Sequence, residues 1–125
     1  PEEDIVWANE YAAANGLKLV YCLCINANLY IENRIPPADV LLKHNCHIVV
    51  GTDSYSSNWQ LSIASEIGAL RKHFPAIPEA TILQWATRNG AAALGWSEQL
   101  GVFNPGMRPG LVQINADYSG SHLIL

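Results

Sequence analysis

One acidic residue in this sequence stands where α/β enzymes place catalytic groups. Residues 46–51 (CHIVVG) form a nearly continuous apolar run that predicts a buried strand, and Thr52, Asp53 and Ser54 follow it directly. Enzymes built as α/β barrels carry their catalytic side chains at the carboxyl ends of the strands, so Asp53 is the first candidate. The same residues are ordinary turn and helix-cap residues, and this pattern alone favours that structural role.

The four histidines are the side chains that most often join a carboxylate in catalysis or at a metal. His47 opens the predicted strand that Asp53 follows, and six residues of strand separate the two by about 20 Å. His44 lies at the same distant end, His73 ends a helix that returns to that end, and His122 lies in the last residues. We therefore expect no histidine of this chain to meet Asp53, which excludes a serine–histidine–aspartate triad.

Three cysteines are present, and two of them, Cys22 and Cys24, stand two positions apart in a run of strand character. Side chains at such positions lie on one face of a strand and point in parallel, a poor geometry for a disulfide between them. We predict reduced thiols that pack in the core and carry no redox chemistry.

Composition limits the classes of protein to which the chain can belong. Its 125 residues supply at most one domain, and 50% apolar against 14% charged residues exclude a disordered chain. Eleven acidic and seven basic residues give a net charge of −4 without a basic run, which argues against nucleic-acid binding. No apolar stretch approaches the length of a membrane span. We predict a soluble cytoplasmic protein that binds neither nucleic acid nor membrane.

Alternating helical and strand patterns indicate an α/β fold. Residues 2–15 predict a helix that ends at Gly16, and residues 17–24 predict a strand covered on both faces. After a long loop, residues 38–45 predict a short helix that leads into the strand 46–51. Strand, helix and strand together make one unit of a parallel sheet.

The second half of the chain is mostly helical in pattern and ends in β structure. Ser57 and Gln60 have the spacing of a capping box, so we predict a helix that starts there and runs to about Phe74. The remaining elements are a helix over 78–88, an interruption at Asn89-Gly90, a short turn over 91–94, and β pieces over 111–114 and 122–125.

Several segments taken together resemble a known family. In chain order they are residues 24–30 (CINANLY), 35–37 (IPP), 47–54 (HIVVGTDS), 86–95 (ATRNGAAALG) and 104–112 (NPGMRPGLV). This series resembles the C-terminal part of the metal-dependent amidohydrolase superfamily, in particular its chlorohydrolase and nucleobase-deaminase branch. The resemblance covers nearly the whole chain in the right order. Two segments depart from it. The family's frequent His-Cys-Pro-x-Ser-Asn stands here as residues 23–28 (LCINAN), and the usual Ala-Asp-Leu-Val of the tail stands as residues 109–112 (PGLV).

The resemblance implies a fold. Residues 1–103 would be the C-terminal portion of a (β/α)8 TIM-type barrel, its last two βα units with further helices, and residues 104–125 a short β tail belonging to a small β-sandwich. A complete barrel of this kind takes about 250 residues. We therefore expect the chain to be a C-terminal fragment that is inactive by itself.

The resemblance also implies a reaction. The family binds one divalent metal at the barrel mouth, zinc or iron, and Asp53 matches the aspartate that is both a metal ligand and a proton carrier. A bound divalent metal lowers the pKa of its water to about 7, and the resulting hydroxide attacks a trigonal carbon with loss of ammonia or chloride. Hydrolytic deamination of a heterocyclic base is one such reaction.

Other participants follow from the same resemblance. The family's histidine ligands are absent from this chain, so most ligands of the metal must lie outside it. The implied partner is a small-molecule substrate, and we expect the full-length protein to be a homo-oligomer.

Three residues are candidates for contact with that substrate, and each has a structural alternative. Asn28 lies in the long loop after the first predicted strand, where it either faces the substrate or forms a turn. Ser54 stands near a helix start that can hold an anionic group, although capping alone explains it. Trp59 can stack on a flat base, but its helical spacing with Ile63 and Ile67 favours a core position.

A second class of function is left open by the residues themselves. The chain can be read as a complete, non-enzymatic α/β binding or interaction module that uses the serine-rich helix start at 54–58. The uncovered edges of a two-stranded parallel sheet weigh against this alternative.

Overall fold

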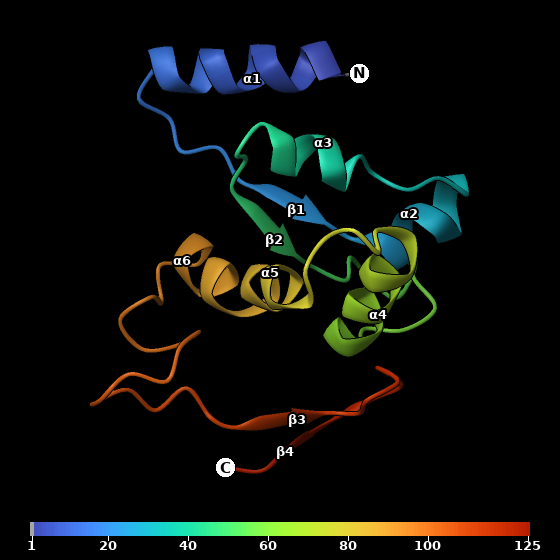
Figure 1. Cartoon of the computed structure of the whole chain (residues 1–125), viewed down its shortest axis with the longest axis vertical. Coiled ribbons are helices and arrows are strands. Elements are labelled where there is room, and N and C mark those ends of the chain that lie inside the picture. The colour runs from blue at the N-terminus through green and yellow to red at the C-terminus, as the bar shows by residue number, and fades with distance from the viewer. Residues whose placement is uncertain (1) are drawn as a thin grey trace.

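Two short strands pair in parallel at the centre of the chain, and helices surround them (Figure 1). The computed structural model describes residues 2–125. Strand β1 (Tyr21–Leu23) pairs with β2 (Ile48–Val50), and the helices α2 (Ile25–Glu32) and α3 (Ala38–Lys43) form the crossover between them. A parallel pair requires such a crossover connection. The α/β arrangement predicted from the sequence is confirmed.

Both strands are shorter than the apolar runs that predict them. Within the described residues, β1 and β2 pair only with each other. At one end of the pair the Tyr21 N–H donates to the His47 carbonyl, and at the other end the Gly51 N–H donates to the Leu23 carbonyl. The prediction of a long loop after β1 is wrong, because helix α2 begins at Ile25, two residues after the strand ends.

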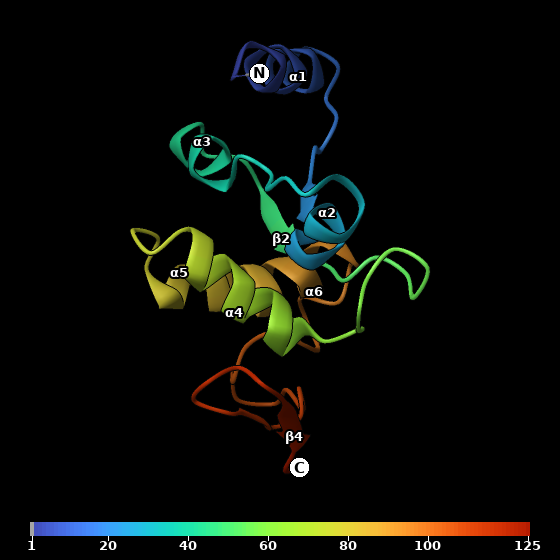
Figure 2. The ribbon, with the colours of Figure 1, turned by 90° about the vertical axis from the view of Figure 1, so that its right-hand side faces the viewer.

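Helix α1 (Glu2–Ala14) precedes β1 and lies at one end of the molecule (Figures 1 and 2). The chain leaves it at Gly16, whose φ of 65° is left-handed, as predicted for a helix stop. The Glu2 carboxylate accepts a hydrogen bond from the Lys43 ammonium at 2.8 Å and also contacts His44. This exposed contact links α1 to the end of α3.

The helix that follows β2 begins later than the sequence predicts. Helix α4 (Ile63–His73) has Ser62 as its N-cap, with the Ser62 hydroxyl accepting a hydrogen bond from the Ser65 N–H at 3.2 Å. The predicted capping box at Ser57 is therefore wrong. Residues 51–62 form a loop instead, because the intervening Asn58 side chain is bonded to the backbone of that loop and to α4.

The third helical region is one continuous run. Helix α5 (Glu79–Gln84), a π-helical turn η1 (Trp85–Asn89) and α6 (Gly90–Ala93) follow one another without a break. The interruption predicted at Asn89-Gly90 is wrong, since Gly90 has a helical φ of −59°. Instead of forming a turn, the Asn89 amide donates to the Ile48 carbonyl at 2.8 Å and fastens the π-helical turn to β2.

The core packs around the strand pair and takes buried side chains from α1, α2, α3, α4, α5 and η1. Its largest fully buried apolar side chains come from α2, β2, α4 and α5, and they are Ile25, Ile48, Ile67, Leu70 and Ile82. Ile67 and Leu70 of the predicted α4 stripe are thus buried as their spacing predicts, whereas Ile63 is exposed. No helix among residues 2–125 has both the length and the apolar character needed to cross a membrane.

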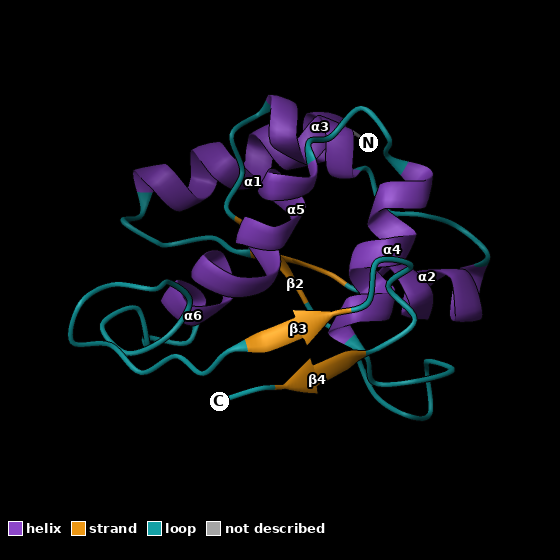
Figure 3. Ribbon diagram, turned by 60° about the horizontal axis from the view of Figure 1, so that its bottom comes forward, coloured by secondary structure: helices purple, strands orange, loops and turns teal. Residues whose placement is uncertain are grey.

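The C-terminal residues form a hairpin beneath the helices (Figure 3). Strands β3 (Val112–Ile114) and β4 (Ser121–Leu123) pair in antiparallel fashion. Both predicted β pieces are confirmed, the first one residue shorter and the second shifted to start one residue earlier. Tyr118, in the hairpin loop, donates a hydrogen bond from its hydroxyl to the Glu79 carboxylate. Its ring lies 5.6 Å from the Arg71 guanidinium, which also pairs with Glu79. The division of the chain into residues 1–103 and 104–125 stays a prediction.

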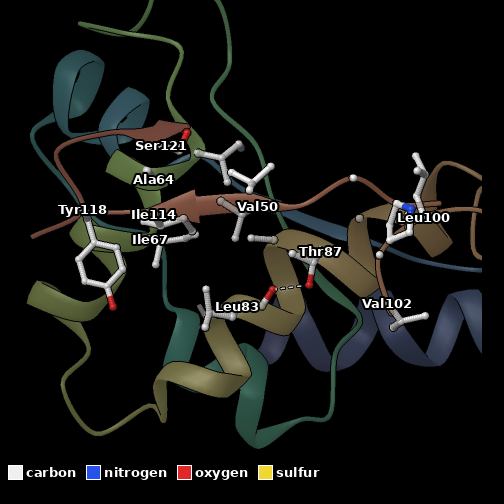
Figure 4. Close-up of a pocket in the computed structure, with 18 of the residues that line it drawn as sticks. Val50, Ala64, Ile67, Leu83, Thr87, Leu100, Val102, Ile114, Tyr118 and Ser121 are labelled. Atoms are coloured by element: carbon white, nitrogen blue, oxygen red, sulfur yellow. Dashed lines mark hydrogen bonds between the residues drawn. The ribbon is translucent and has the colours of Figure 1, made fainter. Parts of the chain in front are cut away.

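An apolar cleft of about 1050 Å³ separates the hairpin from the helices (Figure 4). Side chains of β2, α4, α5 and the hairpin line it, among them Val50, Ile67, Leu83 and Ile114. Asp53 is not among the lining residues. This cleft therefore does not include the Asp53 side chain, although Val50, the last residue of β2, lines it.

Candidate functional site

The carboxyl ends of β1 and β2 meet at one edge, and Asp53 lies there, three residues after the end of β2. It is exposed, and its backbone has a left-handed φ of 58°. Aspartate tolerates this region better than most residues do. The sequence thus predicted the position of Asp53 correctly, and its catalytic role stays a prediction.

A buried hydrogen-bond network fixes the loop that carries Asp53. The Asn58 amide, 4% exposed, donates to the Thr52 carbonyl at 2.6 Å and to the Glu66 carboxylate at 3.0 Å. Glu66 is fully buried in the first turn of α4. Buried polar groups need such partners, so the network ties the residue before Asp53 to a rigid helix.

The same carboxylate also holds the segment that follows β1. The second oxygen of Glu66 accepts a hydrogen bond from the Asn26 N–H at 3.1 Å. The Asn26 and Gln60 amides both donate to the Ser65 hydroxyl, at 3.2 Å and 2.9 Å. The first turn of α4 therefore positions the polypeptide after both strands.

Glu66 and Asn58 were not identified as site residues from the sequence. The sequence places Asn58 within the predicted serine-rich helix start at 54–58, which can hold an anionic group but is explained by capping alone. The available signal was a carboxylate at position 66 among the apolar residues Ile63, Ile67 and Leu70, because a charged residue on a buried stripe requires partners.

Two thiols lie at the same edge as Asp53. The sulfurs of Cys22 and Cys24 are 4.0 Å apart, and Cys22 is exposed. The predicted core position of Cys22 is wrong, because Leu23 takes the buried face of β1 and its neighbours point away from that face. Burial raises the pKa of the Cys24 thiol to about 12, with further contributions from Cys22 and the Glu66 charge, while the Asp53 backbone N–H opposes the shift.

The three predicted substrate residues have different surroundings. Asn28 is half-buried in the first turn of α2, where its N–H donates to the Cys24 carbonyl at 3.0 Å. Ser54 is exposed, with its hydroxyl 2.8 Å from the Ser56 hydroxyl. Trp59 is 63% exposed and packs edge-to-face with Tyr30 at 5.3 Å between ring centroids.

The core position favoured for Trp59 is wrong. The residue lies in the loop before α4, outside the helix whose apolar stripe it was predicted to share. Both rings of the Trp59–Tyr30 pair are exposed.

The donor atoms in residues 2–125 do not make a complete metal site. No three histidine, cysteine, aspartate or glutamate side chains in this range are grouped so that they can hold a metal ion. His44 contacts Glu2, and His47 precedes β2, at the opposite end of the strand from Asp53. At most Asp53 fits as one oxygen donor of a larger site.

Comparison with known proteins identifies the family. The model of the Amidohydrolase family matches residues 1–122. A 5-methylthioadenosine/S-adenosylhomocysteine deaminase from Thermoanaerobacter pseudethanolicus is 32% identical over 98 residues, which cover 73% of this chain and 23% of that protein. The enzyme of the same name from Pelotomaculum thermopropionicum is 31% identical over 107 residues, 80% of this chain and 24% of that protein.

A solved structure gives the same result. An adenosine deaminase from Xanthomonas campestris with bound zinc superposes with a TM-score of 0.69 and 29% identity, over 81% of this chain and 24% of that one. The chain thus spans less than a quarter of the length of each of these proteins. From the family match over nearly all of its residues, the chain belongs to the amidohydrolase family.

Proposed function

We propose that this chain is part of a hydrolase that releases ammonia from a heterocyclic base. The observation that carries the proposal is an exposed aspartate at the carboxyl edge of two parallel strands, held by a buried network, in a chain of the amidohydrolase family. The relatives described above are named deaminases, which favours ammonia over chloride as the leaving group. Family membership also favours an enzyme over a binding module.

The proposed fold of the whole protein is a (β/α)8 barrel. In it, β1 and β2 with their helices are the last two βα units, and residues 104–125 belong to a small β-sandwich. The parallel pair, the crossover and the similarity to a deaminase structure support this assignment. In a closed barrel the uncovered edges of β1 and β2 would pair with further strands.

We propose Asp53 as one ligand of a divalent metal, zinc or iron. Zinc is favoured because the similar adenosine deaminase structure contains it. The remaining ligands would come from polypeptide outside these 125 residues, since residues 2–125 hold no complete donor group. By itself the 125-residue chain is therefore expected to be inactive.

In this proposal Asp53 also moves a proton. Water adds to the trigonal carbon that bears the amino group, and the Asp53 carboxylate takes a proton from the water and returns it to the departing amine. Exposure of the side chain at the edge is a requirement for this role. Asn28, Ser54 and Trp59 are proposed to contact the small-molecule substrate, with Trp59 stacking on the base.

The test is ammonia release by the full-length protein from adenosine, 5-methylthioadenosine and S-adenosylhomocysteine. Replacement of Asp53 by asparagine is expected to lower kcat by about 100- to 10,000-fold. Asp39→Asn is the matched control, because Asp39 is an exposed aspartate on α3. Release of ammonia from none of the three substrates, or full activity of the Asp53→Asn enzyme, contradicts the proposal. A homo-oligomeric, cytoplasmic protein is the accompanying prediction.

A further inference from the structure

The thiols of Cys22 and Cys24 lie close to each other and next to Gly51. Their sulfurs lie 4.0 Å apart on the face of β1 opposite Leu23. A Cβ placed on Gly51 would lie 2.7 Å from the Cys22 sulfur and 3.3 Å from the Cys24 sulfur. The two sulfurs thus occupy the space that any other residue at position 51 would fill.

This sulfur spacing suits a tetrahedral cation. Zinc binds thiolate sulfur at about 2.3 Å, and two such bonds at a tetrahedral angle place the sulfurs about 3.8 Å apart. The observed spacing therefore needs only a small movement of either side chain. Within the 125-residue chain, which the test below uses, Cys22 is exposed to solvent.

We propose that Cys22 and Cys24 form a bidentate site for a thiophilic divalent cation of the zinc and cadmium class. Thiolate ligands select soft and borderline metals of this kind over magnesium or calcium. Binding replaces one proton on each sulfur, and both protons pass to the solvent. No third protein donor is grouped with the pair among residues 2–125, so the other two coordination positions are left to water.

The site is separate in its donors from the one proposed for Asp53. One site uses the two sulfurs of Cys22 and Cys24, and the other uses the carboxylate oxygens of Asp53. A cation on the thiols therefore does not require the Asp53 side chain. The proposal goes beyond the deaminase assignment and stands or falls independently of it.

Cadmium alone is the probe, titrated into the 125-residue chain under reducing conditions. We expect one cadmium per chain, with the ultraviolet charge-transfer absorption of cadmium thiolate. Cys22→Ser should weaken cadmium binding on the order of 100-fold, because one of two linked donors is lost. Gly51→Ala should also weaken binding, since the added Cβ displaces both sulfurs.

Two matched variants locate the site. Cys46→Ser removes the third thiol, which accepts a hydrogen bond from Asn9 elsewhere in the chain, and should leave the titration unchanged. Asp53→Asn should leave it unchanged as well. The proposal is overturned if Cys22→Ser binds cadmium with wild-type affinity while Cys46→Ser or Asp53→Asn loses cadmium binding.

Protection from alkylation tests the same site in the unaltered chain, so folding of a variant is not at issue. Bound cadmium should slow the reaction of Cys22 and Cys24 with N-ethylmaleimide, read by mass spectrometry of the peptides, and leave the rate at Cys46 unaffected. Equal rates with and without cadmium at Cys22 and Cys24 contradict the proposal.

Discussion

The carboxyl edge of β1 and β2 and the attachment of the C-terminal hairpin differ in how they are stabilised. At the edge, the fully buried Glu66 receives hydrogen bonds from Asn58 and Asn26. At the hairpin, Tyr118 meets Glu79 and Arg71, whose side chains are 47% and 40% exposed, beside an open apolar cleft. The edge is thus held by buried bonds within the chain, and the hairpin by a few contacts near solvent.

This difference predicts an order of effects. Breaking a buried hydrogen bond leaves a desolvated polar group without a partner, whereas an exposed ion pair contributes little because water screens it. Substitutions at the edge should therefore affect the stability of the whole chain. Substitutions at the hairpin should loosen residues 112–123 and leave the strand pair intact.

The largest expected effect is that of Glu66→Ala. It leaves the Asn58 amide and the Asn26 N–H without their acceptor in a buried region, which should lower the free energy of unfolding by about 3 kcal/mol. Urea denaturation followed by circular dichroism measures this change. Glu66→Gln, which keeps one carbonyl acceptor in the same volume, should cost less. A Glu66→Ala chain as stable as the original would refute the role of the network.

Tyr118→Ala should have the next largest effect, about 1 kcal/mol. It removes the hydroxyl bound to Glu79 and the ring over Arg71, so the amides of β3 and β4 should exchange faster with deuterium. Protection of the β1 and β2 amides should not change. Tyr118→Phe retains the ring and should lose only part of the effect. Equal loss of protection in both regions would show that the hairpin and the edge are coupled.

The parts of the fold that the sequence predicts are those set by local pattern. The helix over 2–15 has its own stop at Gly16, and the run 46–51 is apolar enough to indicate a strand in any context. The position of Asp53 followed from this strand, because a residue just after a parallel strand lies at its carboxyl edge. Local rules therefore located the candidate site.

What the sequence did not predict depends on partners distant in the chain. Asn58 binds Glu66 eight positions later, and this moves the helix start from Ser57 to Ser62. Asn89 donates to the carbonyl of Ile48, 41 positions earlier, so a dipeptide typical of turns remains helical. Residue propensity carries no information on such tertiary bonds.

Gly68, which faces the hairpin, and Gly90, which does not, should respond differently to replacement by alanine. A Cβ at Gly68 would lie 2.9 Å from the Tyr118 Cβ, whereas one at Gly90 meets nothing nearer than 3.9 Å. Gly90→Ala should therefore stabilise the chain by roughly 0.5–1 kcal/mol, the usual gain within a helix. Gly68→Ala should not, because the hairpin must shift away from α4. Thermal melting compares the two, and an equal gain in Tm would show that Tyr118 does not pack on Gly68.

The smallest expected effect is on the acid stability of the hairpin. The Ser119 hydroxyl and N–H lower the pKa of Asp117 below its ordinary 3.8. Because the unfolded chain takes up this proton more readily, the stabilisation is complete above pH 3.8 and is lost as the pH falls through the folded-state pKa. Exchange of the Ser119 amide, followed by NMR between about pH 6 and about pH 2, should therefore show extra opening at the acid end. Asp117→Asn keeps the acceptor oxygen without the titration and should remove that dependence. Since the Asp117 carboxylate is exposed, the acid-induced opening should be confined to the hairpin loop. If the amides of β1 and β2 lose their protection from exchange over the same pH range, the acid-sensitive group lies at the carboxyl edge of these strands instead.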